Sequence, residues 1–599
     1  MLEKDEKIKN KKYKYITKIR KLDLIDDVEI LDIIKNCYTK RKSNIKRIVI
    51  SDAPYSITFQ EKENLTNLYY NNGFTRGLVE EINAFDNTDF KTLSYFPVFR
   101  NKNLIPSVDI LQDYFDNMIP NASYRDYYYD PKIIETANLK LNIDPFRFNP
   151  GFELPAKNNF DKLQPFLKTH MPATRPNSYK ETLLAALKRN LCVPQLQTIV
   201  SYNTLKKIMV KKFISAYIPK ENRDILRGYL GNKIDVNIDN AYTWLNTQQA
   251  KIDRTIDPNF ELENTDLEYY NYMIKPTPKP VLDTSGINTY SALQTIAYHN
   301  KNINSIFCSI FKIIKNRLIN VLDKRFRIFT DCSTEEFSDE LNKDFSADML
   351  DKLYKLEIDL SKYDKSQGKL FLDIEIEIYR ILGVPIYLLK QWYNAHLNTT
   401  LYDRINKLKF FVQYQRKSGN ASTYLGNTIV LMVVIASLFN MDDVELGLFS
   451  GDDSLLLSKT KIADRNHECA NLFNLESKFF NYKYSYFCSK FILNIDGYFK
   501  IIPDPLKILI KFGRSDLVNY QHLEDYRIST KDLLILYNDA NIDEKLGNAM
   551  RERYKLTMDV TYLIENILAF VNDKEKFKTL FYIEHNAIIS RDPSRPNLD

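Results

Sequence analysis

Apolar and polar side chains alternate along residues 355–360, and this period of two predicts a β-strand. The strand would carry Asp359 near its end, with the carboxylate at the rim of a sheet. From Leu370 the apolar residues recur at helical spacing, so a helix is expected to follow. Asp364 lies between the two elements, near the start of that helix. Taken alone, two acids in this arrangement are most often structural.

Two apolar runs, residues 446–449 and 455–457, flank the sequence Gly451-Asp452-Asp453. This pattern predicts a β-hairpin whose tight turn carries both acids. Adjacent carboxylates repel each other, and a structure that keeps them together usually supplies a cation for them to share. A solvated Gly-Asp turn is the alternative, and for an isolated motif it is the commoner one.

The longest apolar run, residues 429–439, has about half the length that a bilayer-spanning helix needs, so it predicts a buried helix. A turn at Ser418 and Gly419 precedes this helix, and Thr423 and Asn427 lie four residues apart on one helix face. Small hydrogen-bonding side chains at that spacing can line a groove that holds a sugar. The alternative is an N-cap followed by two ordinary polar residues.

Basic residues gather in two other stretches. Ser178 followed by Glu181 is typical of a capping box, and the leucines after it predict a helix over residues 176–191. The basic sequence at residues 188–190 lies near the end of this helix, where it either complements the helix dipole or contacts a polyanion. Prolines hold residues 274–282 extended, so that Lys275 and Lys279 project from either a surface loop or a segment that binds triphosphate or RNA backbone.

Farther along the chain, residues 474–480 place Lys478 in an apolar, strand-like setting, and residues 484–491 predict an aromatic strand. His467 and Cys469 are two residues apart, but no second ligand pair of suitable spacing follows them. We therefore interpret both as ordinary helix residues and expect no zinc site.

Composition adds little to this picture. With 599 residues, 44% hydrophobic content and a net charge of +7, the chain can bury a large core and offers no strong bulk-charge argument for nucleic acid. The lysine-rich stretch at residues 9–21 is either a solvated helix face or a weak RNA-binding or membrane-surface patch. Six cysteines without a C-x-x-C pair favour a reducing compartment, and we expect no secretion signal and no transmembrane segment.

In their order and intervals, these stretches resemble the RNA-dependent RNA polymerases of positive-strand RNA viruses in the alphavirus-like supergroup, in particular the tobamovirus-like (virga-like) replicases. The resemblance runs from about residue 107 to 550. Its motifs are residues 359–367 for motif A, 415–428 for B, 451–453 for C, Lys478 for D, 487–490 for E and 273–296 for F, with a family counterpart for 188–190. Where relatives often carry a third basic residue in motif F, this chain has Val281.

The resemblance implies an α+β, right-hand polymerase fold with fingers, a palm built on an antiparallel sheet with flanking helices, and a thumb. The domains would be a basic extension at residues 1–105, fingers at 106–350, a palm at 351–495 with a fingers insertion near 385–414, and a thumb at 496–599.

It also implies roles for individual residues. Asp359, Asp452 and Asp453 would hold two Mg²⁺ ions, with Mn²⁺ as a substitute, and Lys478 would be the general acid for pyrophosphate. The nucleotide would be bound by two further groups. The ribose-sensing group is Asp364, Ser418, Gly419, Thr423 and Asn427, and the triphosphate group is Lys275, Lys279 and, assisting them, Arg416.

The expected function is RNA-templated RNA synthesis for viral genome replication and transcription. The partners would be viral RNA template and product, ribonucleoside triphosphates, and a methyltransferase and helicase replicase protein, because the chain has no G-x-x-x-x-G-K-[ST] loop. The expected location is the host cytoplasm, in replication complexes that reach membranes through partners. A reverse transcriptase and a non-catalytic, polymerase-derived RNA-binding scaffold are the alternatives.

Overall fold

The computed structural model describes residues 48–52, 55–59, 104–119, 160–172, 175, 177–191, 201–248, 256–257, 260–262, 265–280 and 292–587. The basic stretch at 9–21, almost all of the predicted extension at 1–105, and Val281 with the rest of the motif F block up to residue 291 lie outside these ranges. The chain divides into two units, one of Met1–Lys102 with Leu536–Ile542 and one of Asn103–Ile535 with Asp543–Asp599. In the first unit, β1 (Ile48–Asp52) and β2 (Tyr55–Phe59) form an antiparallel pair.

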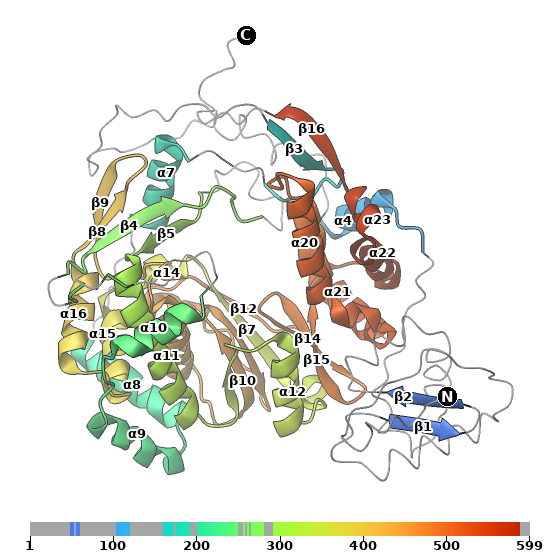
Figure 1. Ribbon diagram of the computed structural model, residues 1–599. Coiled ribbons are helices and arrows are strands. Elements are labelled where there is room, and N and C mark those ends of the chain that lie inside the picture. The colour runs from blue at the N-terminus through green and yellow to red at the C-terminus, as the bar shows by residue number, and fades with distance from the viewer. Residues whose placement is uncertain are drawn as a thin grey trace. The chain divides into compact units, whose positions relative to one another are not determined.

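A five-stranded sheet carries the acids singled out above (Figure 1). Its order is β12-β7-β11-β10-β6, with bounds β12 Ser477–Phe480, β7 Tyr354–Leu360, β11 Asp453–Ser458, β10 Val444–Ser450 and β6 Phe326–Ile328. All neighbours pair antiparallel except β6 and β10, which are parallel. The predicted strand into Asp359 and the predicted hairpin are both confirmed.

The turn between β10 and β11 consists of Gly451 and Asp452 only. Asp453 already pairs with Ser450 as the first residue of β11, so the expectation that the turn holds both acids is wrong for Asp453. Gly451 has a φ of +63°, a conformation that costs glycine little because it has no Cβ.

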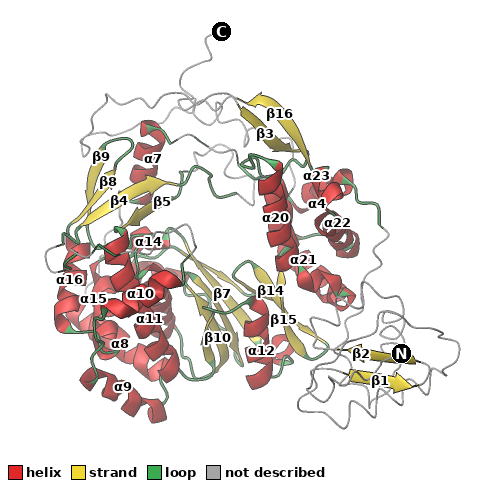
Figure 2. Cartoon of the chain, in the orientation of Figure 1, coloured by secondary structure: helices red, strands yellow, loops and turns green. Residues whose placement is uncertain are grey.

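Both faces of the sheet are buried, and the strand period assigns each residue to one of them. Leu456 faces a core built with α8 (Tyr202–Tyr217), α11 (Lys301–Val321), α15 (Lys369–Ile381) and α17 (Thr423–Leu438). Leu455 and Leu457 face the opposite core, with α12 (Thr334–Asp344) and the three-stranded sheet described below. Helices therefore dominate one face and strands contribute much of the other (Figure 2).

Helices α15 and α17 are the two that the sequence predicts after Asp364 and after the Ser418-Gly419 turn, and both belong to the first of these cores. In α17, residues 425 to 436 are all buried, which confirms the buried-helix interpretation of the apolar run. Among the described residues, no helix combines the length and the apolar content needed to cross a bilayer. Other helices around this core are α9 (Arg223–Gly231), α10 (Ile238–Asn246), α14 (Tyr363–Ser366), α16 (Ile386–Leu397) and α18 (Asn466–Phe473), the last of which contains His467 and Cys469.

A second sheet has the order β5-β4-β8-β9 and packs against α7 (Tyr179–Arg189). Its strands are β5 Thr295–Tyr298, β4 Tyr269–Ile274, β8 Thr399–Asp403 and β9 Leu408–Val412. Ser178 caps α7 by accepting a hydrogen bond from the Glu181 amide, which confirms the N-cap half of the predicted capping box. The Glu181 carboxylate forms an ion pair with Arg175. The core between helix and sheet includes Leu183, Tyr272 and Phe410.

The third sheet consists of β13 (Ser485–Phe487), β14 (Lys490–Ile495) and β15 (Tyr498–Pro503). The expectation of one aromatic strand over 484–491 is wrong, because Cys488 and Ser489 both adopt positive φ and reverse the chain between β13 and β14. Neither residue belongs to the types that usually signal such a turn.

After β15, the chain forms α19 (Pro505–Phe512), α20 (Tyr520–Leu533), α21 (Asp543–Tyr554), α22 (Val560–Asn572) and α23 (Lys574–Lys578), with α4 (Val108–Met118) beside α22. A last strand, β16 (Phe581–Ala587), pairs with β3 (Phe160–Pro165).

Asp504 joins the third sheet to these helices. This fully buried residue caps α19 by accepting a hydrogen bond from the Leu506 amide at 3.0 Å. Its other carboxylate oxygen accepts hydrogen bonds from the hydroxyls of Tyr486, in β13, and Tyr554, in α21. One side chain therefore satisfies a helix end and two largely buried hydroxyl groups.

We expect Asp504→Ala to lower the free energy of unfolding by about 2–4 kcal/mol, because it removes a cap and leaves two tyrosine hydroxyls unpaired. Asp559→Ala is the matched control, since Asp559 is exposed and caps α22 through one bond to the Thr561 amide. That variant should lose only about 1 kcal/mol. Urea unfolding of both variants measures the difference, and equal losses would contradict the linking role of Asp504.

Candidate active site

Three carboxylates from two distant parts of the sequence lie at one rim of the five-stranded sheet. Ser454 of β11 pairs with Ile358 of β7 in an antiparallel ladder. Asp453, which precedes Ser454, therefore lies beside Asp359, which follows Ile358. Asp452 precedes them in the β10–β11 turn. All three side chains are exposed, in contrast to the buried residues that follow them in the strands.

These acids influence one another. The pKa of Asp453 rises to about 6, first because surrounding protein displaces water and then because of the negative charges of Asp452 and Asp359. A hydrogen bond from the Cys488 thiol and the positive charge of Lys279 oppose this rise. Carboxylate oxygens that repel each other in this way fit a hard divalent cation in their donor chemistry. In the described part of the chain, however, no three His, Cys, Asp or Glu residues already stand together as a metal-binding group.

Lys478 occupies the other side of Asp359. It lies in β12, directly opposite Asp359 in the ladder, and its side chain is exposed. Asp359 is thus flanked by a basic residue on one neighbouring strand and an acidic one on the other.

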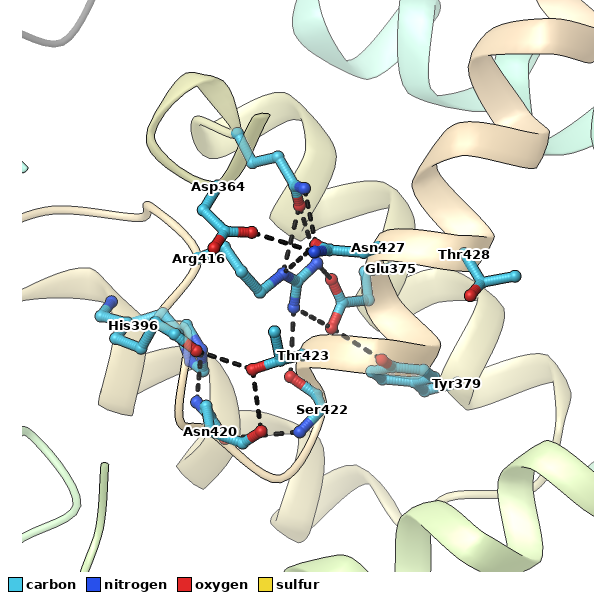
Figure 3. Close-up of polar contacts among 12 residues, drawn as sticks. Asp364, Glu375, Tyr379, His396, Arg416, Asn420, Ser422, Thr423, Asn427 and Thr428 are labelled. Atoms are coloured by element: carbon cyan, nitrogen blue, oxygen red, sulfur yellow. Dashed lines mark hydrogen bonds and ion pairs between the residues drawn. The ribbon is translucent and has the colours of Figure 1, made fainter. Parts of the chain in front are cut away.

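The Asp364 and Asn427 side chains come together beside this rim (Figure 3). The Asn427 amide Nδ2 donates to Asp364 Oδ1 at 2.9 Å, and the Tyr363 hydroxyl donates to the Asn427 carbonyl oxygen at 3.0 Å. Burial raises the pKa of Asp364, while the hydrogen bond from Asn427 opposes the rise. One turn of helix α17 thereby gains a fixed contact with the segment after β7.

The same helix is tied to the acidic turn. The Gly451 amide donates a hydrogen bond to Thr428 Oγ1 at 2.9 Å. Because Thr428 follows Asn427, the amide that contacts Asp364 and the turn that carries Asp452 are positioned by consecutive residues of α17.

The remaining residues of the predicted ribose group lie in the loop before α17 and at the first position of that helix. The Ser418 hydroxyl donates to the Thr295 carbonyl, and the Gly419 amide donates to the Ala297 carbonyl at 3.0 Å, so that the loop is attached to β5. A Cβ on Gly419 would lie 2.7 Å from Ile296 Cγ2, which explains the need for glycine. The hydroxyl of Thr423, the first residue of α17, donates back to this loop, to the carbonyls of residues 417 and 420.

Arg416 does not lie where a triphosphate-binding residue would be expected. Its side chain is only 3% exposed and forms an ion pair with Glu375, which is 1% exposed. Although burial lowers the pKa of Arg416, the charge of Glu375 and their hydrogen bonds outweigh it and raise the pKa above its usual range. A guanidinium held in this way supports its neighbours and is unsuited to a direct triphosphate contact.

The next residue, Lys417, is also buried. Its ammonium nitrogen lies 5.6 Å from the centre of the Tyr270 ring and finds no hydrogen-bond acceptor in the described residues. Burial, followed by the charge of Arg416, lowers the pKa of Lys417 well below its usual value.

Lys275 and Lys279 are both exposed, as expected for residues that bind a charged ligand. The Lys275 amide donates to the Gln294 carbonyl at 2.8 Å, which continues the β4–β5 pairing. Lys279 lies close enough to the acids to oppose the raised pKa values of Asp364 and Asp453.

Asn190, from the basic sequence at 188–190, supports the start of the loop before α17. Its side-chain amide donates to Gln415 Oε1 at 3.1 Å, and its backbone carbonyl accepts from Gln415 Nε2 at 2.8 Å. The Tyr272 hydroxyl donates to Asn190 Oδ1 at 3.1 Å. A structural role therefore accounts for Asn190, whereas Arg189 donates to the Ala292 carbonyl.

Sequence analysis missed Glu375 and gave no role to Gln367. Gln367 is 2% exposed and hydrogen-bonds both Arg416 and Asn427. Glu375 could have been noticed as an acid four residues from Phe371 and from Tyr379, on the buried stripe of a predicted helix. A carboxylate on an apolar stripe needs a partner.

Comparisons with known proteins identify related sequences. Residues 136–580 match a protein family described as RNA dependent RNA polymerase. The RNA replication protein of Citrus leprosis virus C is 32% identical over 489 residues, which cover 81% of this chain and 19% of that protein. The replicase large subunits of Tobacco mosaic virus (strain OM) and Sunn-hemp mosaic virus are 32% and 31% identical, each over 81% of this chain and 30% of the relative. The chain thus spans less than a third of the length of these relatives.

Gly426 offers a test of the buried arginine. A Cβ at this position in α17 would lie 2.6 Å from Arg416 Nη1, and the paired guanidinium cannot move away cheaply. We expect Gly426→Ala to destabilise the protein by about 1–3 kcal/mol, although alanine normally stabilises a helix interior by about 0.5–1 kcal/mol relative to glycine.

Gly228→Ala in α9 is the matched control, because nothing lies within 4 Å of its added methyl group. It should be neutral or stabilising in the same urea unfolding measurement. Stabilisation by both substitutions would contradict the placement of Arg416 against α17.

Proposed function

Because this chain belongs to the RNA-dependent RNA polymerase family, we propose that it synthesises RNA on an RNA template for the replication and transcription of a positive-strand RNA virus genome. The observation that carries the proposal is the placement of Asp359, Asp452 and Asp453 at one sheet rim, together with the hydrogen-bonded pair of Asp364 and Asn427. Phosphoryl transfer depends mainly on positioning and on neutralising charge, and this rim offers groups for both tasks.

We propose that the five-stranded sheet, with its helices, is the palm of a right-hand polymerase. Residues 351–495 would form it, with 106–350 and the insertion near 385–414 as fingers and 496–599 as thumb. The insertion contains β8 and β9, and residues 496–599 contain α19 to α23, which supports this division. Strand β6 joins the palm sheet from the region before residue 351.

The three rim carboxylates would hold two Mg²⁺ ions, with Mn²⁺ as a substitute, since these metals favour oxygen ligands. When bound, the ions would activate the primer 3′-hydroxyl and neutralise the charge on the leaving pyrophosphate. Lys478, exposed beside Asp359, would give a proton to that pyrophosphate.

The nucleotide would lie against the exposed lysines and the buried amide. Lys275 and Lys279 would contact the triphosphate. Asp364 and Asn427, with Ser418, Gly419 and Thr423 around them, would pair with the ribose hydroxyl groups, and a deoxyribonucleotide would leave these groups unpaired. Arg416 would position Asn427 by donating a hydrogen bond to its side-chain oxygen from the protein interior.

Two of the relatives are named replicase large subunits, which supports a place for this chain in a larger replicase with RNA and nucleotides as ligands. We propose that methyltransferase and helicase activities come from partner segments or proteins. The complex would work in the host cytoplasm and reach membranes through those partners.

We expect the purified protein to extend an RNA primer with ribonucleotides in the presence of Mg²⁺, and Asp452→Asn to lower the rate by more than about 10²-fold, because charge stabilisation in the transition state is lost. Asp442→Asn, an exposed acid between α17 and β10, is the control and should extend normally. Undiminished synthesis by Asp452→Asn would refute the assignment. Preferential use of deoxyribonucleotides by the wild type would instead favour a reverse transcriptase.

We expect Asn427→Ala to lower the preference for ribonucleotides over 2′-deoxyribonucleotides by about tenfold, the effect of losing one well-placed polar contact. The measurement is the ratio of kcat/KM values for the matched nucleotides. Asn471→Ala, on the exposed face of α18, is the control. An unchanged ratio would remove Asn427 from the sugar-reading role.

A further inference from the structure

The orientation of the Asn427 amide is fixed from the protein interior. Its oxygen Oδ1 accepts hydrogen bonds from Gln367 Nε2 at 2.8 Å and from Arg416 Nε at 3.0 Å. Its nitrogen Nδ2 donates to Asp364 Oδ1 at 2.9 Å. A flipped amide would turn its N–H groups toward two donors and its oxygen toward a carboxylate, so only one orientation satisfies all these contacts.

This orientation leaves two groups for a ligand. One N–H of Asn427 and the second carboxylate oxygen of Asp364 have no partner among the described residues. A hydroxyl group can accept from the first and donate to the second at the same time. The value of the pair for sugar recognition therefore depends on which way the amide points.

Glu375 holds the arginine that holds the amide (Figure 3). Arg416 Nη1 donates to Glu375 Oε1 at 3.0 Å, and Nη2 donates to the other carboxylate oxygen. The Tyr379 hydroxyl donates to Oε1 at 2.7 Å. A buried ion pair is tolerated only when its geometry is good and its remaining hydrogen bonds are made, and this one meets both conditions.

The other N–H groups of Arg416 are also used. Nη2 donates to Gln367 Oε1 at 2.8 Å, and Nη1 donates to Ser422 Oγ at 3.1 Å. Gly426 leaves room for the guanidinium against α17. Arg416 and Gln367 therefore brace each other, and each presents a donor to the same oxygen of Asn427.

We propose that Glu375 and Gln367 are positioning residues for ribose selection, which act by holding the Asn427 amide in one orientation. The inference rests on the proposed function. Glu375 and Gln367 are 1% and 2% exposed, so they do not touch a nucleotide themselves. Their loss should weaken discrimination between sugars more than it weakens binding of the triphosphate.

Glu375→Gln tests the inference with little change of volume. Its new amide group would face the guanidinium, break the ion pair and loosen Arg416. We expect the ratio of kcat/KM for a ribonucleotide over its 2′-deoxy form to fall about 5- to 10-fold, somewhat less than for direct loss of the amide. Glu377→Gln is the matched control, because Glu377 lies two residues away on the same helix and forms an ion pair with the surface residue Arg380.

A double-mutant cycle separates positioning from a general structural role. In an Asn427→Ala background there is no amide to orient, so Glu375→Gln should cause no further change in the sugar ratio. An equal drop in both backgrounds would overturn the inference, as would an unchanged ratio with a lowered Tm alone.

Gln367→Met provides a second route if Glu375→Gln does not fold, because it removes both amide contacts of Gln367 and keeps the ion pair. It should lower the sugar ratio in the same direction, and an unchanged ratio in the folded variant would overturn the inference. If the wild-type protein incorporates no ribonucleotide, the proposed function itself fails. If the wild type discriminates and the variants discriminate equally well, only the positioning role fails.

Discussion

The register between β7 and β11 is the constraint on which the rest of the site depends. Both faces of this sheet are buried, with Leu456 in one core and Leu455 and Leu457 in the other. A slip of one residue would exchange the faces and move every side chain of the strand into the wrong core. The same pairing that satisfies the two cores brings Asp453 beside Asp359. The pairing of β12 with the other edge of β7 places Lys478 opposite Asp359.

The site has an exposed half, in which charge repulsion dominates, and a buried half, in which hydrogen bonding dominates. The rim acids face water and repel one another, so their arrangement favours a cation. Asn427 and Arg416 lie inside the protein, where each polar atom needs a partner and where the cost of an unmade hydrogen bond makes one arrangement strongly preferred. The hydrogen bond from Gly451 to Thr428 joins the two halves, so a shift of α17 would move the turn that carries Asp452 together with the Asn427 amide.

Much of this arrangement can be predicted from the sequence because it follows from short-range patterns. The strand into Asp359 shows a period of two, and the hairpin at Gly451 and the buried helix after Thr423 stand out as apolar runs. The turn at Cys488 and Ser489 was missed, since neither residue type announces a positive φ. The burial of Arg416 was also missed, because its partner Glu375 lies 41 residues away and a basic residue before a Ser-Gly turn suggests exposure.

Lys417 shows how misleading a count of basic residues can be. The sequence presents Arg416 and Lys417 as two adjacent positive charges, yet the first forms a buried ion pair with Glu375 and burial lowers the pKa of the second well below its usual value. Both side chains are buried, so neither is available to contact a phosphate in solvent. Each lysine or arginine that contacts a phosphate releases about one bound counterion. If the chain binds RNA as proposed, the salt sensitivity of binding should therefore follow the exposed basic residues and be shallower than the motif suggests.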